Sequence, residues 1–156
     1  MKTTRFVRLT MVGLLAGALI AIAAMAHAAD TSPVPASAPA PLKAARAKID
    51  SRDYAGAIPL LQVALKEKPS DADALNLMGF SLRKTGKQAE ALDYYNRALA
   101  VQPKHLGANE YLGELYVEMG QLDKAKERLA VLEAACGKNC EQTRDVATAI
   151  AKAEKK

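Results

Sequence analysis

Residues 71–103 read DADALNLMGFSLRKTGKQAEALDYYNRALAVQP, and this stretch decides the fold. Its apolar residues, beginning with Leu75, Met78 and Leu82, recur every three or four positions, which is the period of one face of an α-helix. Gly86 interrupts the pattern with a residue that suits the left-handed end of a helix. The pattern then resumes until the final proline, which cannot continue a helix. The stretch therefore predicts two amphipathic helices joined by a tight turn.

The same residue types return at a spacing of 34 residues on both sides of this stretch. The series are Ala57, Ala91 and Ala125; Ala45, Gly79 and Gly113; Leu61, Tyr95 and Leu129; and Pro69 and Pro103. A fixed period of this length indicates one supersecondary unit stacked on copies of itself. We therefore predict an all-α protein in which three units, residues 42–69, 70–103 and 104–137, form a stack.

These units resemble the tetratricopeptide repeat, a helix–turn–helix module of 34 residues. The resemblance rests on the small residues Gly79 and Ala91, the turn glycine Gly86, the aromatic Tyr95 and the closing Pro103. It implies a helical solenoid of about seven helices, in which the first helices of successive repeats line a concave groove. In this family such a groove binds a peptide or a protein.

The first and third units depart from the pattern. The first unit has Lys48 where the second has Leu82, and Arg52 where the second has its turn glycine. We therefore expect its first helix to be the shortest and the least stable. The third unit has Leu132 where a small residue is usual, and Gly137 where the proline is usual. Because these departures fall at the end of the unit, they are typical of the point where a repeat array stops.

Residues 1–28 have the features of a secretory signal peptide: three basic residues, an uncharged apolar run and a final A-x-A pattern. An uncleaved membrane anchor is the alternative, although the run is short for a span of about 20 residues. Residues 29–41 read ADTSPVPASAPAP, and their prolines predict a disordered linker. The protein would then work in the bacterial periplasm, with no membrane anchor after cleavage.

The charge distribution argues against nucleic acid as a partner. The 156 residues carry a formal net charge of +5, but Lys2, Arg5 and Arg8 belong to the predicted signal peptide, so cleavage would leave +2. The remaining basic residues are interspersed with acidic ones. A nucleic-acid-binding protein would gather them on one face.

Cys136 and Cys140 are the two cysteines of the chain. An oxidising compartment favours a disulfide between them, and Gly137 and Asn139 allow the backbone to bring the sulfurs together. The bridge would hold an amphipathic capping helix, within residues 138–156, on the last repeat. Redox chemistry and metal binding are weaker alternatives, because a redox pair more often has the CxxC spacing and a metal needs further ligands.

The resemblance also implies which side chains line the groove. These candidate partner-binding residues are Arg46, Asn76, Phe80, Arg83, Lys84, Glu110, Glu114 and Glu118. Phe80 either anchors a partner or packs against the neighbouring repeats. The three glutamates share one helix face, which is either a solvated surface or the acidic end of the groove. A mixed or basic region would lie near Arg46, Arg83 and Lys84.

A binding module is the function that these features favour. Nothing in the sequence resembles a nucleophile–base pair, a set of metal ligands or a phosphate-binding loop, so we expect neither an enzyme nor a cofactor. Related arrays that clamp the C-terminal carboxylate of a chaperone have Lys, Asn and Arg at set groove positions, where this chain has Leu77 and Tyr111 among others. The alternatives are a structural subunit of a cell-envelope assembly and a thiol-dependent redox partner using Cys136 and Cys140.

Overall fold

A computed structural model describes residues 40–155 of the protein. These residues form seven α-helices and no strand. The helices are α1 (Pro41–Asp50), α2 (Tyr54–Glu67), α3 (Ala72–Lys84), α4 (Gln88–Val101), α5 (Leu106–Glu118), α6 (Leu122–Cys136) and α7 (Glu141–Ala153). The all-α fold is confirmed, and α1 is the shortest helix, as expected. The predicted signal peptide and the linker up to residue 39 lie outside the described residues.

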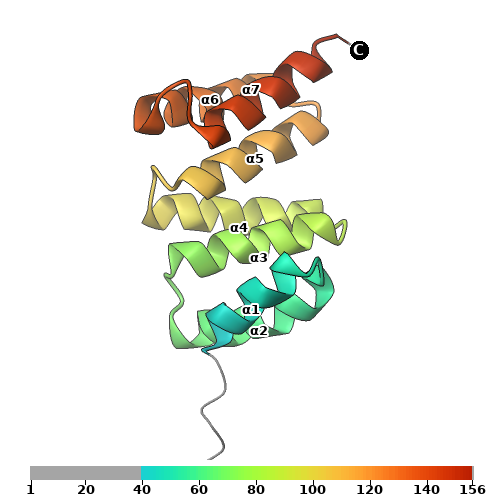
Figure 1. The fold of residues 1–156 in the computed structure, drawn as a ribbon, viewed down its shortest axis with the longest axis vertical. Helices are drawn as coiled ribbons and strands as arrows, with labels where there is room; N and C mark the ends of the chain where they lie inside the picture. Colours follow the sequence, from blue (N-terminus) through green and yellow to red (C-terminus); the bar gives the residue numbers. More distant parts are fainter. Residues whose placement is uncertain (1–39, 156) are drawn as a thin grey trace, which may run out of the picture. The chain divides into compact units, whose positions relative to one another are not determined.

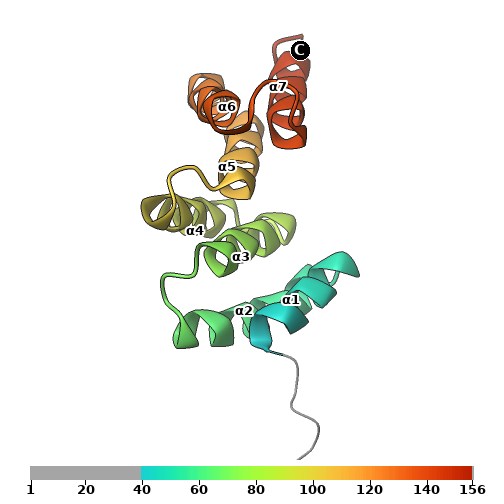
Figure 2. The ribbon, with the colours of Figure 1, turned by 60° about the vertical axis from the view of Figure 1, so that its left-hand side comes forward.

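The helices follow one another along a stack of pairs, α1 with α2, α3 with α4, and α5 with α6 (Figure 1). Among the seven, α1 contacts α3, α3 contacts α5, and α5 contacts α7, whereas α2, α4 and α6 do not contact one another. Figure 2 shows α1, α3 and α7 on one side and α2, α4 and α6 on the other. We call the surface formed by α1, α3, α5 and α7 the inner face, and that formed by α2, α4 and α6 the outer face.

The turn inside each repeat uses a left-handed residue. The backbone angle φ is +82° at Gly86 and +71° at Gly120, and it is +62° at Arg52 in the first repeat. Glycine adopts this conformation freely, whereas the Cβ atom of an arginine makes it costly. Helices α2 and α3 begin with aspartate caps: Asp53 and Asp71 each accept a hydrogen bond from the backbone N–H three residues ahead, at 2.9 and 3.0 Å.

The N-terminal end of the stack begins at Pro41, the last residue of the predicted linker. Proline suits the first turn of a helix because its fixed φ matches the helix and its missing N–H is not needed there. None of the helices in the described residues combines the length and the apolar character that crossing a membrane would require.

Each of the first two repeats pairs a small residue on its first helix with a large one on its second. At Gly79 an added Cβ atom would lie 2.7 Å from the ring of Tyr95, closer than two carbon atoms that are not bonded to each other can approach. Tyr95 is fully buried and fills the space that the glycine leaves. At the equivalent positions the first repeat has Ala45 and Leu61, both fully buried.

Helix α7 closes the C-terminal end of the stack against α5 and α6. Its buried residues Val146 and Ile150 pack in one cluster with Leu132 of α6. Leu132 is the large residue found where a small one is usual in the family. The structure explains the departure, because this side chain fills the contact with the terminal helix instead of a contact with another repeat.

A disulfide joins the end of α6 to the start of α7, as predicted. The Cα atoms of Cys136 and Cys140 are 5.9 Å apart. The buried hydroxyl of Thr143 donates a hydrogen bond to the carbonyl of Gly137 at 2.9 Å and lies 3.0 Å from the sulfur of Cys140. The loop is therefore held to α7 by a covalent bond and by a buried side chain, which is the arrangement of a structural bridge.

Candidate functional site

All the predicted groove residues lie on helices of the inner face. Arg46 lies on α1, Asn76, Phe80, Arg83 and Lys84 lie on α3, and Glu110, Glu114 and Glu118 lie on α5. The structure divides them among four groups: an aromatic cluster, an arginine with two carboxylates, a polar chain at the start of α5, and two buried polar side chains.

The aromatic cluster consists of Tyr54, Phe80 and Tyr111. The ring centroids of Phe80 and Tyr111 are 4.7 Å apart, and Tyr54 meets Phe80 edge-on at 5.6 Å. Lys84 places its ammonium 5.2 Å from the centre of the Phe80 ring. All three rings are half-buried, so they contact one another and also keep part of their surface open to solvent. Phe80 therefore packs against both neighbouring repeats, and part of its surface stays exposed to solvent.

Arg83 joins α3 to α5. Its guanidinium lies 2.6 Å from a carboxylate oxygen of Glu114 and 2.7 Å from one of Glu118, and its side chain is only 7% exposed. Burial alone would lower the pKa of Arg83, but its hydrogen bonds with the two glutamates outweigh burial and raise it. The same hydrogen bond lowers the pKa of Glu118. Arg83 is therefore charged, and its guanidinium is already bonded to Glu114 and Glu118.

With this pairing the region near Arg46, Arg83 and Lys84 is mixed in charge, which is one of the two options that the sequence left open. Equivalent positions are 34 residues apart, but Arg83 bonds residues 31 and 35 positions away. The equivalent position on α5 lies between these two glutamates, so the long side chain of Arg83 reaches two side chains that stand one turn apart on α5. Glu114, at 26% side-chain exposure, is consequently part of an ion pair rather than of a solvated face.

A polar chain links α1, α3 and the start of α5. Arg46 donates to one oxygen of Asp73 at 2.7 Å, and the Nε2 atom of His105 lies 2.9 Å from the other oxygen. The Nδ1 atom of His105 accepts the backbone N–H of Ala108 and so caps α5. Because Nδ1 is an acceptor, Nε2 carries the ring proton and donates to Asp73. Both nitrogens of this histidine are therefore engaged.

Glu110 and Asn76 are the buried polar side chains, with residue exposures of 9% and 6%. Burial raises the pKa of Glu110 to about 7, and the negative charges of Glu114, Asp145 and Glu141 add to the effect. The amide oxygen of Asn76 has no hydrogen-bond partner in the described part of the chain. Both side chains stand at the same repeat position, one on α3 and the other on α5.

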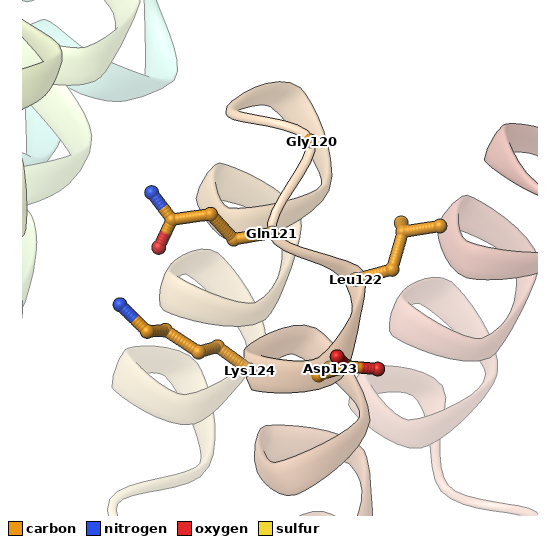
Figure 3. A pocket seen from close by; sticks show the side chains of 5 residues that line it. All are labelled: Gly120, Gln121, Leu122, Asp123 and Lys124. Atoms are coloured by element: carbon orange, nitrogen blue, oxygen red, sulfur yellow. The ribbon is translucent and has the colours of Figure 1, made fainter.

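A shallow hollow of about 390 Å³ lies at the turn between α5 and α6 (Figure 3). It is lined only by residues 120–124, which are consecutive along this turn. Gln121 and Lys124 point to one side of the turn and Leu122 to the other, so the side chains do not converge on a common point (Figure 3). Within residues 40–155, moreover, no group of three or more His, Cys, Asp or Glu side chains is placed to hold a metal ion. The inner face is therefore the candidate site.

Two sequence models of the tetratricopeptide repeat match this protein, one over residues 42–105 and the other over residues 82–142. The chain belongs to the tetratricopeptide repeat family. No curated protein sequence matches it significantly.

Solved tetratricopeptide repeat structures share the fold at low sequence identity. The domain of Sgt2 from Aspergillus fumigatus is 24% identical, with a TM-score of 0.66 over 74% of this chain and 78% of that domain. The type III secretion translocator chaperone SycD of Yersinia enterocolitica is 17% identical, with a TM-score of 0.64 over 73% of this chain and 81% of that protein. A repeat protein from Parabacteroides merdae is 16% identical, with a TM-score of 0.64, and the match covers 74% of this chain but only 44% of that one.

The fold also brings to the site residues that were not among the predicted partner-binding residues: Tyr54, Tyr111, Glu141 and Asp145. A signal existed for Tyr111, because it stands at a position that carboxylate-clamping members of the family use. Glu141 and Asp145 had no such signal, because α7 follows the cysteine loop and lies outside the repeat phase.

Proposed function

We propose that this tetratricopeptide repeat protein is a non-catalytic binding module that holds an extended segment of a protein partner along its inner face. We also propose that it does so in the periplasm, after removal of residues 1–28. The periplasmic location rests on the sequence features of the leader and on the disulfide, since oxidising compartments favour such bonds.

The aromatic cluster is the observation that carries this proposal. Aromatic side chains that remain partly exposed on a polar surface are the usual anchors of protein interfaces. Phe80 and Tyr111 come from two successive repeats, so a segment that crosses them would contact both repeats at once. Lys84 of α3 lies over the Phe80 ring, and a charge beside the anchor would help to set the direction of the segment.

Two further observations support a binding role. The SycD structure was also solved in complex with a peptide of the translocator YopD, and this relative has a TM-score of 0.62 to our protein. In the described residues the one histidine, His105, uses both ring nitrogens to cap α5 and to bond Asp73. It is thus occupied by the fold and is not poised as a catalytic base.

Photocrosslinking in the native cell would test the use of the inner face. A photoreactive phenylalanine at position 80 of the full chain should form an adduct with the partner upon irradiation. The matched control is the same group at Val63, an exposed apolar residue on α2 of the outer face. Adducts from position 63 alone would contradict the proposal and favour a structural subunit that uses its outer face in an envelope assembly.

Cell fractionation and the intact mass of the purified protein would test the location. We expect a periplasmic protein whose mass corresponds to a chain that begins at Ala29. A chain that retains residues 1–28 would instead support the membrane-anchor alternative.

A further inference from the structure

Helix α5 is capped by a histidine at the repeat position where α3 is capped by an aspartate. His105 stands 34 residues after Asp71 in the sequence. Each side chain accepts a hydrogen bond from the backbone N–H three residues ahead, at 3.0 Å from Ala74 and at 3.1 Å from Ala108. An aspartic acid keeps an acceptor oxygen in both of its protonation states, whereas a histidine has no acceptor once both ring nitrogens are protonated. The two caps therefore share their geometry and differ in their chemistry.

The cap of α5 is buried. Residue 105 as a whole is 9% exposed, and Ala108, which donates the hydrogen bond, is fully buried. A buried backbone N–H without an acceptor is costly, because water does not reach it to replace the lost bond. Loss of the acceptor on His105 therefore requires the first turn of α5 to open, so that the N–H of Ala108 meets water.

The other hydrogen bonds of His105 do not use its acceptor nitrogen. The Nε2 atom donates to Asp73 at 2.9 Å, and it carries a proton in the neutral and in the charged ring alike. The side-chain amide of Asn109 donates to the carbonyls of His105 and Pro103, both at 3.0 Å. Among the bonds that His105 forms within residues 40–155, protonation therefore breaks the cap and leaves these contacts in place.

The charges near His105 act in both directions. Asp73 of α3 favours the protonated ring, because it accepts the hydrogen bond from Nε2. Arg46 of α1 bonds the other oxygen of Asp73 at 2.7 Å, and the exposed Lys104 precedes His105 in the loop, so these two cations oppose a further positive charge. The first acid along α5 is Glu110, five positions on. The ring is therefore paired with one carboxylate that it shares with an arginine.

We propose that His105 is an acid-sensitive cap: a proton on Nδ1 releases the N–H of Ala108 and opens the first turn of α5, while Asp73 keeps the ring on α3. Histidine is the side chain that ordinarily changes its charge between about pH 5 and pH 8, so the response lies close to neutrality. The cap of α3 does not share it. The turn that opens directly precedes Tyr111 of the aromatic cluster, and the inference itself does not depend on the proposed binding role.

Amide hydrogen exchange of the purified protein, followed by NMR at about pH 7.5 and at about pH 5, would test the proposal. Each rate is divided by the intrinsic rate of the amide at the same pH. We expect the protection of Ala108 to fall about fivefold or more in acid, as for the loss of a typical N-cap. Ala74 is the control within the same molecule, because Asp71 remains an acceptor, and its protection should not fall.

The variant His105→Asn is the matched control between molecules. Asparagine is a good N-cap residue and does not titrate, so the protection of Ala108 in this variant should be the same at both pH values. An equal fall in the variant and in the parent would overturn the proposal. The comparison of Ala108 with Ala74 in the parent does not depend on how well the variant folds.

The ring nitrogens of His105 report its protonation directly. Their ¹⁵N chemical shifts should show a proton on Nε2 alone at about pH 7.5 and on both nitrogens at about pH 5. A proton on Nδ1 at the higher pH would overturn the proposal, because the cap would then not exist. A ring that stays neutral at the lower pH, or one that becomes charged while Ala108 keeps its protection, would overturn it as well.

Discussion

The first repeat and the second repeat have the same architecture but are held to their neighbours in different ways. Helix α3 is joined to α5 by Arg83, whose side chain is 7% exposed and bonds two carboxylates. Helix α1 is joined to α3 by Arg46, whose ion pair with Asp73 is exposed at both ends, at 47% and 57%. The first repeat also has the shorter inner helix and an arginine in its left-handed turn.

The difference between the buried ion pairs of Arg83 and the exposed pair of Arg46 indicates that the repeats contribute unequally to stability. In a stack in which each repeat contacts only its neighbours, stability is close to a sum of repeat and interface terms. A weak repeat at one end can therefore open while the rest of the stack stays folded. The other end is closed by α7 and the disulfide, so opening should begin at α1 and α2.

Removal of the two inner-face arginines should give the largest contrast. Arg83→Met keeps most of the apolar stem but leaves Glu114 and Glu118 without their cation, which we expect to lower the free energy of unfolding by about 3 kcal/mol. Arg46→Met removes an exposed pair and should cost less than about 1 kcal/mol. Urea unfolding followed by circular dichroism measures both values. Equal losses in the free energy of unfolding would show that the two arginines hold their repeats to the neighbouring repeats equally strongly, contrary to this prediction.

The packing of the two repeats can be compared by exchanging their small and large residues. Gly79→Ala places a Cβ atom against the ring of Tyr95 and should destabilise the protein by about 2 kcal/mol. The double variant Gly79→Ala with Tyr95→Leu reproduces the pair Ala45 and Leu61 of the first repeat. It should be more stable than the sum of the single effects predicts, by about 1 kcal/mol or more. Strict additivity in this double-mutant cycle would show that the side chains at positions 79 and 95 do not pack against each other.

Glu110 should make the protein less stable as the pH rises. Its pKa is raised from 4.5 to about 7 by folding, so between these values the folded state binds more protons than the unfolded state. The free energy of unfolding therefore falls as the pH increases from about 4.5 to about 7, and the loss is complete above that range. Glu110→Gln should stabilise the protein by between about 1 and 2 kcal/mol at about pH 8 and have no effect at about pH 4.

Glu118, on the same helix, is a control for the direction in which Glu110 changes stability with pH. The hydrogen bond with Arg83 lowers the pKa of Glu118, so its contribution is present above the unfolded pKa and is lost in acid. Glu118→Gln should therefore destabilise at neutral pH, opposite to Glu110→Gln. If both substitutions changed stability in the same direction, the burial of Glu110 would not be the cause.

The sequence predicted the elements of the fold better than the contacts of the site. Helix period, the turn glycines and the fixed spacing follow from local chemistry, so the seven helices and the inner-face residues could be read directly. The partners of those residues could not, because the bonds of Arg83 to residues 31 and 35 positions away depend on how side chains pack between the helices. Two of the charges that act on Glu110 come from α7, which follows the cysteine loop and lies outside the repeat period.

Arg52 offers the smallest and most direct test of the weakness of the first repeat. Its φ of +62° is the conformation in which the second and third repeats have glycine. Arg52→Gly relieves a steric cost of roughly 1–2 kcal/mol, but glycine also increases the freedom of the unfolded chain, so we expect a net gain of about 0.5–1 kcal/mol. Native-state hydrogen exchange should show slower opening of α1 and α2, while the protection of α5 and α6 stays the same. Gly86→Arg is the reciprocal variant, and it should destabilise α3 and α4 because it places a Cβ atom where φ is +82°. If Arg52→Gly left the exchange of α1 and α2 unchanged, the exposed coupling through Arg46, and not the turn, would be what limits the first repeat.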